Sequence, residues 1–193
     1  MRIHRTSLAI CATIAFATTL SAQDAPLLAP RFRMATYAGA SIPTGALRDG
    51  FDNAFLLGAN ATYDLRSHFA LLGGFDWTNP ATTFSPSDTH ANVYQANLGL
   101  ELGGARNSMK RWALVPFADL GGGIRHYDFR SDGVSNRTGG VGFASLGTEV
   151  AVGRTALRVA ATDNVFSFED PTAAATKATR NDVGLSLGFS FHP

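Results

Sequence analysis

The sequence predicts an all-β protein, an eight-stranded antiparallel up-and-down transmembrane β-barrel preceded by a cleavable signal peptide. Three observations support this fold class. The chain begins with a segment that has the features of a secretory signal, apolar side chains alternate with small or polar ones through eight later segments, and most connections between these segments are alternately long and short. Strict alternation is the pattern of strands with two different faces.

Residues 1–22 are predicted to be the signal peptide. Arg2 and Arg5 precede an apolar run over residues 8–20, and small residues follow at Ser21 and Ala22. The run is too short for a spanning helix, which needs about 20 apolar residues. Cleavage there leaves a single domain, 23–193, which we expect to be the barrel.

Cysteine and charge content limit the classes of protein that the mature chain can belong to. Cys11 is the only cysteine, and as part of the signal it leaves a mature chain without disulfides. The alternative, in which Cys11 becomes a lipidated first residue, leaves fewer apolar residues before it than the usual 7 to about 15. Without the signal, 14 basic and 15 acidic residues give a net charge of −1. This balance gives no indication of a basic surface for nucleic acid.

The first four predicted strands cover residues 31–42, 54–65, 69–78 and 93–103. Alternation is clearest in the second of these, whose apolar face consists of Phe55, Leu57, Ala59, Ala61, Tyr63 and Leu65. The three residues before the third strand predict a tight antiparallel turn. In the less regular first strand we expect Phe32, Met34, Thr36 and Ala38 to point outward. That phase places Arg33 inside, and Tyr37 with it.

The last four predicted strands cover residues 112–129, 140–152, 156–164 and 183–191. The first of these contains Pro116 and the run Gly121 to Gly123, so we expect a bulge at which the alternation changes phase. The final strand is the most regular, because Val183, Leu185, Leu187, Phe189 and Phe191 alternate with glycine and serine. Helical periodicity is limited to residues 172–178.

The connections between the predicted strands are 43–53, 66–68, 79–91, 104–111, 130–139, 153–155 and 169–181. The long ones are polar and rich in turn formers, and they fall at one end of the predicted sheet. An even number of strands with long loops at one end and tight turns at the other is typical of outer-membrane barrels.

Two arrangements fit eight alternating strands, and they differ in the direction of the apolar face. In a soluble lipocalin-like barrel this face points inward around a ligand, and in a membrane barrel it points outward at lipid. The charged side chains of the strand bodies are compatible with both, since they all lie on the opposite face. These are Asp64, Asp76, Glu101, Asp119, Glu149 and Arg158, with Arg125 expected to join them. In a membrane barrel we expect them to form static ion pairs in a narrow lumen.

Aromatic residues on the apolar face favour the membrane arrangement. Phe55, Phe75, Trp77 and Tyr94 lie beside the long connections, and Tyr63, Phe69, Trp112, Phe189 and Phe191 lie beside the short ones. The positions between them are aliphatic or small. Two aromatic rims around an aliphatic band are what the two interfaces of a membrane select.

The run GASIPTGALRDGFDNAFLLGANATYDLRSHFALLGGFDW, residues 39–77, resembles the first three strands of the bacterial outer-membrane beta-barrel domain family, the small OmpA- and OmpX-like porin-family proteins. The resemblance covers nearly all of 23–193 in organisation. Its specific parts are the PTG opening of the first long connection, the LGA entry to the second strand, and the C-terminal strand. It implies a barrel with both chain ends on the periplasmic side and long loops outside, but no single activity.

The sequence predicts no catalytic, cofactor-binding or metal-binding residues. The five histidines, His4, His68, His90, His126 and His192, have no ligand spacing such as H-x-x-x-H. His90 with Ser85, Ser87 and Asp88, and His126 with Asp128, are the residues that a lipid-modifying enzyme could use. No G-x-S-x-G motif surrounds either group, so we expect a protein that is not an enzyme and needs no cofactor.

The function expected from these features is that of an integral outer-membrane protein of a Gram-negative envelope, displaying four extracellular loops in a structural or adhesive role. The alternatives are a soluble periplasmic lipocalin-like barrel carrying an apolar ligand, and an outer-membrane lipid-modifying enzyme. The expected partners are outer-membrane lipid and, by the resemblance, the barrel-assembly machinery acting through the C-terminal strand. The chain is expected to be a monomer. His192 and Pro193 after Phe191 depart from the family's usual aromatic end.

Overall fold

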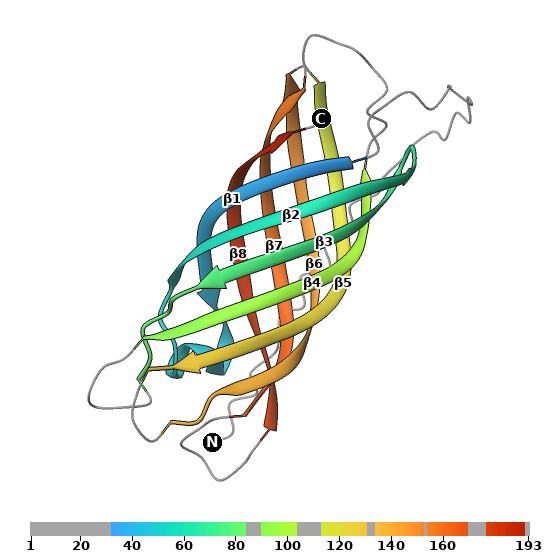
Figure 1. The fold of residues 1–193 in the computed structure, drawn as a ribbon. Helices are drawn as coiled ribbons and strands as arrows, with labels where there is room; N and C mark the ends of the chain where they lie inside the picture. Colours follow the sequence, from blue (N-terminus) through green and yellow to red (C-terminus); the bar gives the residue numbers. More distant parts are fainter. Residues whose placement is uncertain are drawn as a thin grey trace, which may run out of the picture.

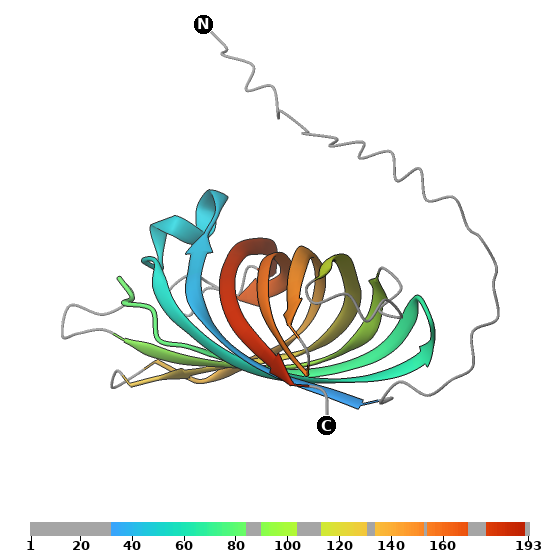
Figure 2. The same ribbon diagram turned by 90° about the horizontal axis from the view of Figure 1, so that it is seen from above.

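The computed structural model describes residues 32–83, 90–103, 113–130, 134–152, 154–169 and 177–191. These form one closed barrel in which eight antiparallel strands follow one another in chain order (Figures 1 and 2). The strands are β1 (Phe32–Pro43), β2 (Ala54–Arg66), β3 (Phe69–Thr78), β4 (Ala91–Gly103), β5 (Ala113–Phe129), β6 (Arg137–Val152), β7 (Thr155–Glu169) and β8 (Lys177–Phe191). A short 3₁₀ helix, η1 (Gly45–Asp49), lies between β1 and β2. Among the described residues, no helix is both long and apolar enough to cross a membrane.

Strand register gives the tilt of the barrel wall. Residues paired across successive strands lead once around the barrel through Phe32, Tyr63, Leu71, Leu100, Leu120, Ala144, Asp163, Val183 and Ile42. The circuit therefore returns to β1 at Ile42, ten residues along the strand from Phe32 and closer to η1. With a rise of about 3.3 Å per residue and a tilt of about 40°, this corresponds to a height of about 25 Å.

The predicted strands are confirmed, with the largest differences at the ends of β7 and β8. Both extend toward the long-loop end, to Glu169 and from Lys177. The sequence pattern was obscured there because the polarity of the faces reverses, with Phe166 and Phe168 inside and Ser167 outside. Of the segment 172–178, in which helical periodicity was noted, only residues 177–178 are described, and they belong to β8.

The bulge predicted near Gly121 is wrong. The pairing of β5 with β4 and β6 runs without a shift through the glycines, so Leu114, Leu120 and Ile124 all point outward. The shift of register that the structure records lies instead in β2, between Asp64 and Arg66. Gly121 faces the interior, where there is no room for a side chain, because a Cβ would meet the carbonyl oxygen of Leu98 and the Phe143 ring.

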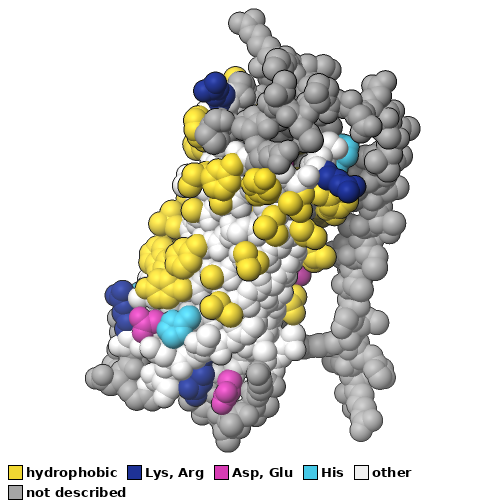
Figure 3. Space-filling model, turned by 45° about the vertical axis from the view of Figure 1, so that its right-hand side comes forward, with side chains coloured by type: hydrophobic (Ala, Val, Ile, Leu, Met, Phe, Trp, Pro, Cys, Tyr) yellow, Lys and Arg dark blue, Asp and Glu magenta, His cyan; other side chains and the backbone are white. Residues whose placement is uncertain are grey.

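The outside of the barrel is apolar. Leu98, Leu114, Leu120, Ile124 and Phe189 are between 61 and 69% exposed. Hydrophobic side chains spread over the barrel body, and most charged ones lie toward its ends (Figure 3). The expected outward direction of Phe32 and Met34 is confirmed, as is the inward direction of Arg33.

Most of the expected aromatic rims are also found on the outer face. Phe55, Phe75 and Tyr94 are exposed toward the end that carries η1, and Tyr63, Phe69, Phe189 and Phe191 toward the end that carries the β2–β3 turn. Trp77 is half-buried, and Trp112 lies outside the described residues. These two ends are called the outer and inner ends below, and they lie at opposite ends of the barrel in Figure 1.

Candidate functional site: the filled lumen

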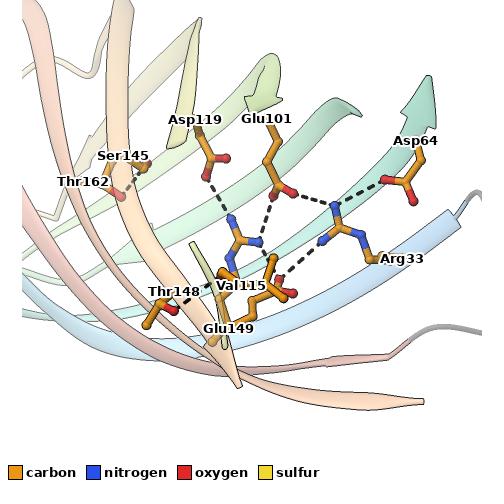
Figure 4. Close-up of polar contacts among 10 residues, drawn as sticks. Arg33, Asp64, Glu101, Val115, Asp119, Ser145, Thr148, Glu149 and Thr162 are labelled. Atoms are coloured by element: carbon orange, nitrogen blue, oxygen red, sulfur yellow. Dashed lines mark hydrogen bonds and ion pairs between the residues drawn. The ribbon is translucent and has the colours of Figure 1, made fainter. Parts of the chain in front are cut away.

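The inner part of the lumen holds a layer of charged side chains from six strands, called the ionic layer. Its members are Arg33 (β1), Asp64 (β2), Glu101 (β4), Asp119 (β5), Glu149 (β6) and Arg158 (β7). Figure 4 labels all of them except Arg158 and shows the labelled ones pointing into the same space. They meet because each lies at an inward position of the alternating pattern.

Glu101 joins the two guanidinium groups of the ionic layer. Arg33 Nη2 lies 2.6 Å from Glu101 Oε1, and Arg158 Nη1 lies 2.8 Å from Glu101 Oε2. Arg158 also donates to Glu149 at 2.8 Å and to Asp119 at 2.9 Å, while Arg33 reaches Asp64 at 3.5 Å. Arg33 is 2% exposed and Glu149 is 0% exposed. Buried charges of this kind are tolerated because each has a partner of opposite sign.

The ion pairs predicted for Glu101, Asp119 and Glu149 are therefore confirmed, but their cationic partners are only partly as expected. Arg158 pairs with all three. Arg33, expected inside but assigned no partner, forms a second centre of the network. A guanidinium with five donors can bridge several carboxylates at once, which the sequence pattern does not reveal.

Asp76 differs from the prediction, because it is held by neutral donors rather than by an arginine. Tyr37 donates its hydroxyl to Asp76 Oδ1 at 2.6 Å, and Asn97 Nδ2 donates to Oδ2 at 2.9 Å. Tyr37 points inward, as expected. Its ring lies over Gly58, where a Cβ would collide with it.

A second set of hydrogen-bonded polar side chains, called the outer ring, lies across the lumen nearer the outer end. Arg125 donates to Asp182 and to Gln95, both at 2.6 Å. Gln95 donates to Asn164 at 3.0 Å, and Asn164 completes the ring by donating to Asp182 at 2.8 Å. Arg125 was expected inside, but Asp182 was missed because it precedes the clear alternation of the last strand.

A cavity of about 80 Å³ lies between these two groups. Its lining includes Tyr37, Asn60, Asp76, Asn97, Ser145 and Thr162, together with Phe143, Arg125 and Arg158. Most of the lining side chains are polar, with Leu56, Leu72, Val93 and Phe143 between them, and the space is large enough for a few water molecules. It is too small for an apolar ligand of the size that lipocalin-like barrels carry.

The outer mouth is closed by an apolar cluster, the outer plug. It consists of Leu47, Phe51, Ala91, Val93, Tyr127, Phe129, Val141, Phe166 and Phe168. Phe51 makes an edge contact with Phe168 at 5.5 Å between ring centroids and lies 5.8 Å from Tyr127. Leu47 and Phe51 come from the first long connection, which was predicted only as a polar loop. Two apolar residues within that polar segment were the available signal.

Backbone contacts fix this connection over the mouth. Asp52 N donates to Ala81 O at 3.0 Å, and Thr83 N donates to Gly50 O at 3.2 Å. The connection between β1 and β2 is thereby bound to the residues that follow β3. The ionic layer, the outer ring and the outer plug together occupy the lumen of the described barrel, apart from the cavity between the first two.

The residues considered for an enzyme do not come together in the described part of the chain. His126 Nδ1 lies 2.7 Å from Thr138 Oγ1, whereas Asp128 accepts from Asn136 at 3.1 Å. His90 is exposed, and its expected companions Ser85, Ser87 and Asp88 lie outside the described residues. Nor do the described residues contain a group of three or more His, Cys, Asp or Glu side chains able to hold a metal ion.

Comparison with known proteins identifies the fold. No family model matches the chain, and no curated protein matches its sequence. Among solved structures, Neisserial surface protein A is similar over 84% of this chain and 96% of its own, with a TM-score of 0.57 and 16% identity. OprG from Pseudomonas aeruginosa covers 86% of this chain and 98% of its own, with a TM-score of 0.47 and 16% identity. Ail of Yersinia pestis covers 83 and 97%, with a TM-score of 0.49 and 13% identity. The first similarity shows that this chain shares the barrel fold of that surface protein.

Proposed function

We propose that this chain is an integral outer-membrane protein, whose barrel crosses the membrane and whose outer end displays four loops in a structural or adhesive role. The observation that carries the proposal is the inverted distribution of polarity. Leucines such as Leu98 and Leu120 are 69 and 67% exposed, while the guanidinium of Arg33 is buried. In water, each exposed leucine would forgo about 1.5 to 3 kcal/mol of burial free energy. In lipid, the same arrangement is favourable.

The dimensions of the apolar band support the same proposal. Phe32 lies in the inner rim and Ile42 near the outer rim, and the strand register separates them by about 25 Å of height. This equals the height of the apolar band of outer-membrane barrels, about 25 Å.

A soluble carrier of an apolar ligand is a poor fit to this interior. Its binding space would have to be the lumen, where the ionic layer and the outer ring leave a cavity of only about 80 Å³. Lipid modification is likewise not proposed, because His126 and Asp128 are engaged with different side chains.

Display at the outer end is supported by the lengths of the strands. Between β6 and β8 the wall continues beyond the aromatic rim, with Thr138, Ser167 and Thr179 on its outward side. A wall that carries polar residues on this side can project into water. The proposed partners are membrane lipid around the apolar band and the barrel-assembly machinery, which would bind β8. The chain is proposed to act as a monomer.

The test is to express the full chain in a Gram-negative host and separate soluble, inner-membrane and outer-membrane fractions by density. We expect recovery in the outer membrane, release only by detergent, and an N-terminus near residue 23 after processing. Recovery in the soluble periplasm without detergent would contradict the proposal. Protease applied to intact cells should cut within the predicted connections 79–91 or 130–139, and a chain resistant until the cells are lysed would argue against display.

A further inference from the structure

The outer aromatic rim is incomplete. It is formed by Phe55 on β2, Phe75 and Trp77 on β3, and Tyr94 on β4. On β6 the corresponding outward positions are Gly140 and Gly142. A Cβ at Gly140 would meet no atom within 4 Å, and one at Gly142 would meet its nearest at 3.9 Å. The aromatic rim therefore covers only β2 to β4, and over β6 the surface is left open because glycine has no side chain.

An acidic side chain lies beside this opening on the outward face. Asp163 on β7 is exposed, and it pairs across the sheet with Ala144 of β6 and Val183 of β8. In the circuit from Phe32 to Ile42 it stands at the sixth of eight steps, so its Cα lies about 6 Å below Ile42. Within the described strands it is the only charged side chain on the outward face between the two rims.

Below Asp163 the outer surface is hollowed. Two adjoining grooves of about 450 and 550 Å³ share Leu146 and Ala161. Ala144, Asp163 and Val183 line the upper groove, while Leu185 and Leu187 line the lower one. Both are shallow and open, and together they form an apolar depression that runs from the middle of the band toward the carboxylate.

The carboxylate has little local compensation. Asn181 Nδ2 donates to Asp163 Oδ1 at 3.4 Å, and this is the only hydrogen bond to the side chain from the described part of the chain. No arginine, lysine or histidine is paired with it there. A cationic group at the opening would satisfy an acid that lies close to a low-dielectric medium.

We propose that this surface binds a lipid whose head group carries a primary amine, with one acyl chain in the grooves and the ammonium at Asp163. The inference rests on the membrane residence proposed above. An ammonium of the ethanolamine type donates hydrogen bonds to the carboxylate, which a choline group cannot do, and a glycerol phosphate head group is repelled by it. The gap over Gly140 and Gly142 gives the head group access to a side chain below the rim.

The experiment is native mass spectrometry of the full chain, delipidated in detergent and titrated with three lipids of identical acyl chains. These are phosphatidylethanolamine, phosphatidylcholine and phosphatidylglycerol. We expect phosphatidylethanolamine to bind about tenfold more tightly than the other two, as one charge-assisted contact implies. Asp163→Asn should abolish the preference, and Asp128→Asn, at an acid beyond the rim, should keep it.

A second pair of variants tests the grooves. Ala161→Leu fills the shared part of the two grooves and should remove tight lipid binding. Ala96→Leu adds the same volume on the outward face of β4 and should leave it intact. Equal binding of the three lipids by the folded barrel overturns the inference. A dimer that Ala161→Leu dissociates also overturns it, because a second copy of the chain would then occupy the grooves. A chain that never folds in detergent, by contrast, contradicts the proposed membrane barrel itself.

Discussion

Glu101 is the residue on which the ionic layer depends most, because it accepts from both Arg33 and Arg158. Glu101→Gln leaves two buried guanidiniums with too little negative charge, and breaking a buried pair costs about 3 to 5 kcal/mol. We expect the free energy of unfolding, measured by urea titration in lipid vesicles, to fall by about that amount. Asp64→Asn is the control, since its contact with Arg33 is 3.5 Å and partly exposed. That variant should lose about 1 kcal/mol or less, and equal losses would show that the network is not centred on Glu101.

Leu98 tests the direction of the apolar face. It lies near the middle of the outward band, where arginine costs about 2 to 4 kcal/mol in a membrane barrel. Leu98→Arg should therefore lower the yield of folded barrel in the outer membrane, measured as the heat-modifiable band on a gel. Asn60→Arg, which places the same side chain beside the cavity in the lumen, should have the smaller effect. The reverse order would mean that the inward and outward faces are exchanged.

At the scale of single strands, some inward glycines lie where close packing of the interior leaves no room for a Cβ. Gly121→Ala brings a Cβ within 2.7 Å of the Phe143 ring and against the backbone of β4. Gly140→Ala adds the same methyl group in open space. We expect the first to lower the free energy of unfolding by more than 1 kcal/mol, as overpacking does, and the second to be neutral. Similar values for the two would rule out a packing role for Gly121.

The last strand closes the barrel, because β8 pairs with β1 from Met34 and Phe191 to Pro43 and Asp182. We predict that trimming the chain back to Phe191 leaves assembly intact or improves it, since the aromatic residue then becomes the terminus. Removal of Phe191 as well should reduce assembly strongly. The measurement is the fraction of chain in the outer membrane after pulse labelling. Equal assembly of the two truncated chains would contradict the expectation that Phe191, at the end of the last strand, is needed for assembly.

Alternation predicted the strands because it reports a difference between two faces, and it fails where that difference disappears. The outer ends of β7 and β8 were missed since Phe166 and Phe168 are inside there. The glycines of β5 carry no polarity, so the alternation does not define which of them face inward, and the predicted bulge is wrong. The inward positions of the charged residues followed from the same alternation. The partners of Arg33 and Asp76 did not, because contacts across the lumen depend on register.

For the whole molecule, closure is what makes an inverted barrel possible. Every strand pairs with two neighbours, so the described wall has no free edge. The charged side chains of the ionic layer and of the outer ring then pair with one another inside, and in the proposed membrane barrel the apolar side chains outside meet lipid. The outer plug adds apolar contacts at the end that the loops cover. In the described wall the outer aromatic rim covers only β2 to β4, and the surface over β6 and Asp163 lies outside it.

The most direct test of this account is the accessibility of spin labels along β2. Cys11 lies in the predicted signal, so single cysteines at Leu56, Leu57, Ala59, Asn60 and Ala61 give one label each in the mature chain. In reconstituted vesicles we expect high collision rates with oxygen at Leu57, Ala59 and Ala61, and low rates at Leu56 and Asn60. Oxygen accessibility that does not alternate, or that peaks at Leu56 and Asn60, would contradict a barrel with lipid outside and a filled polar lumen.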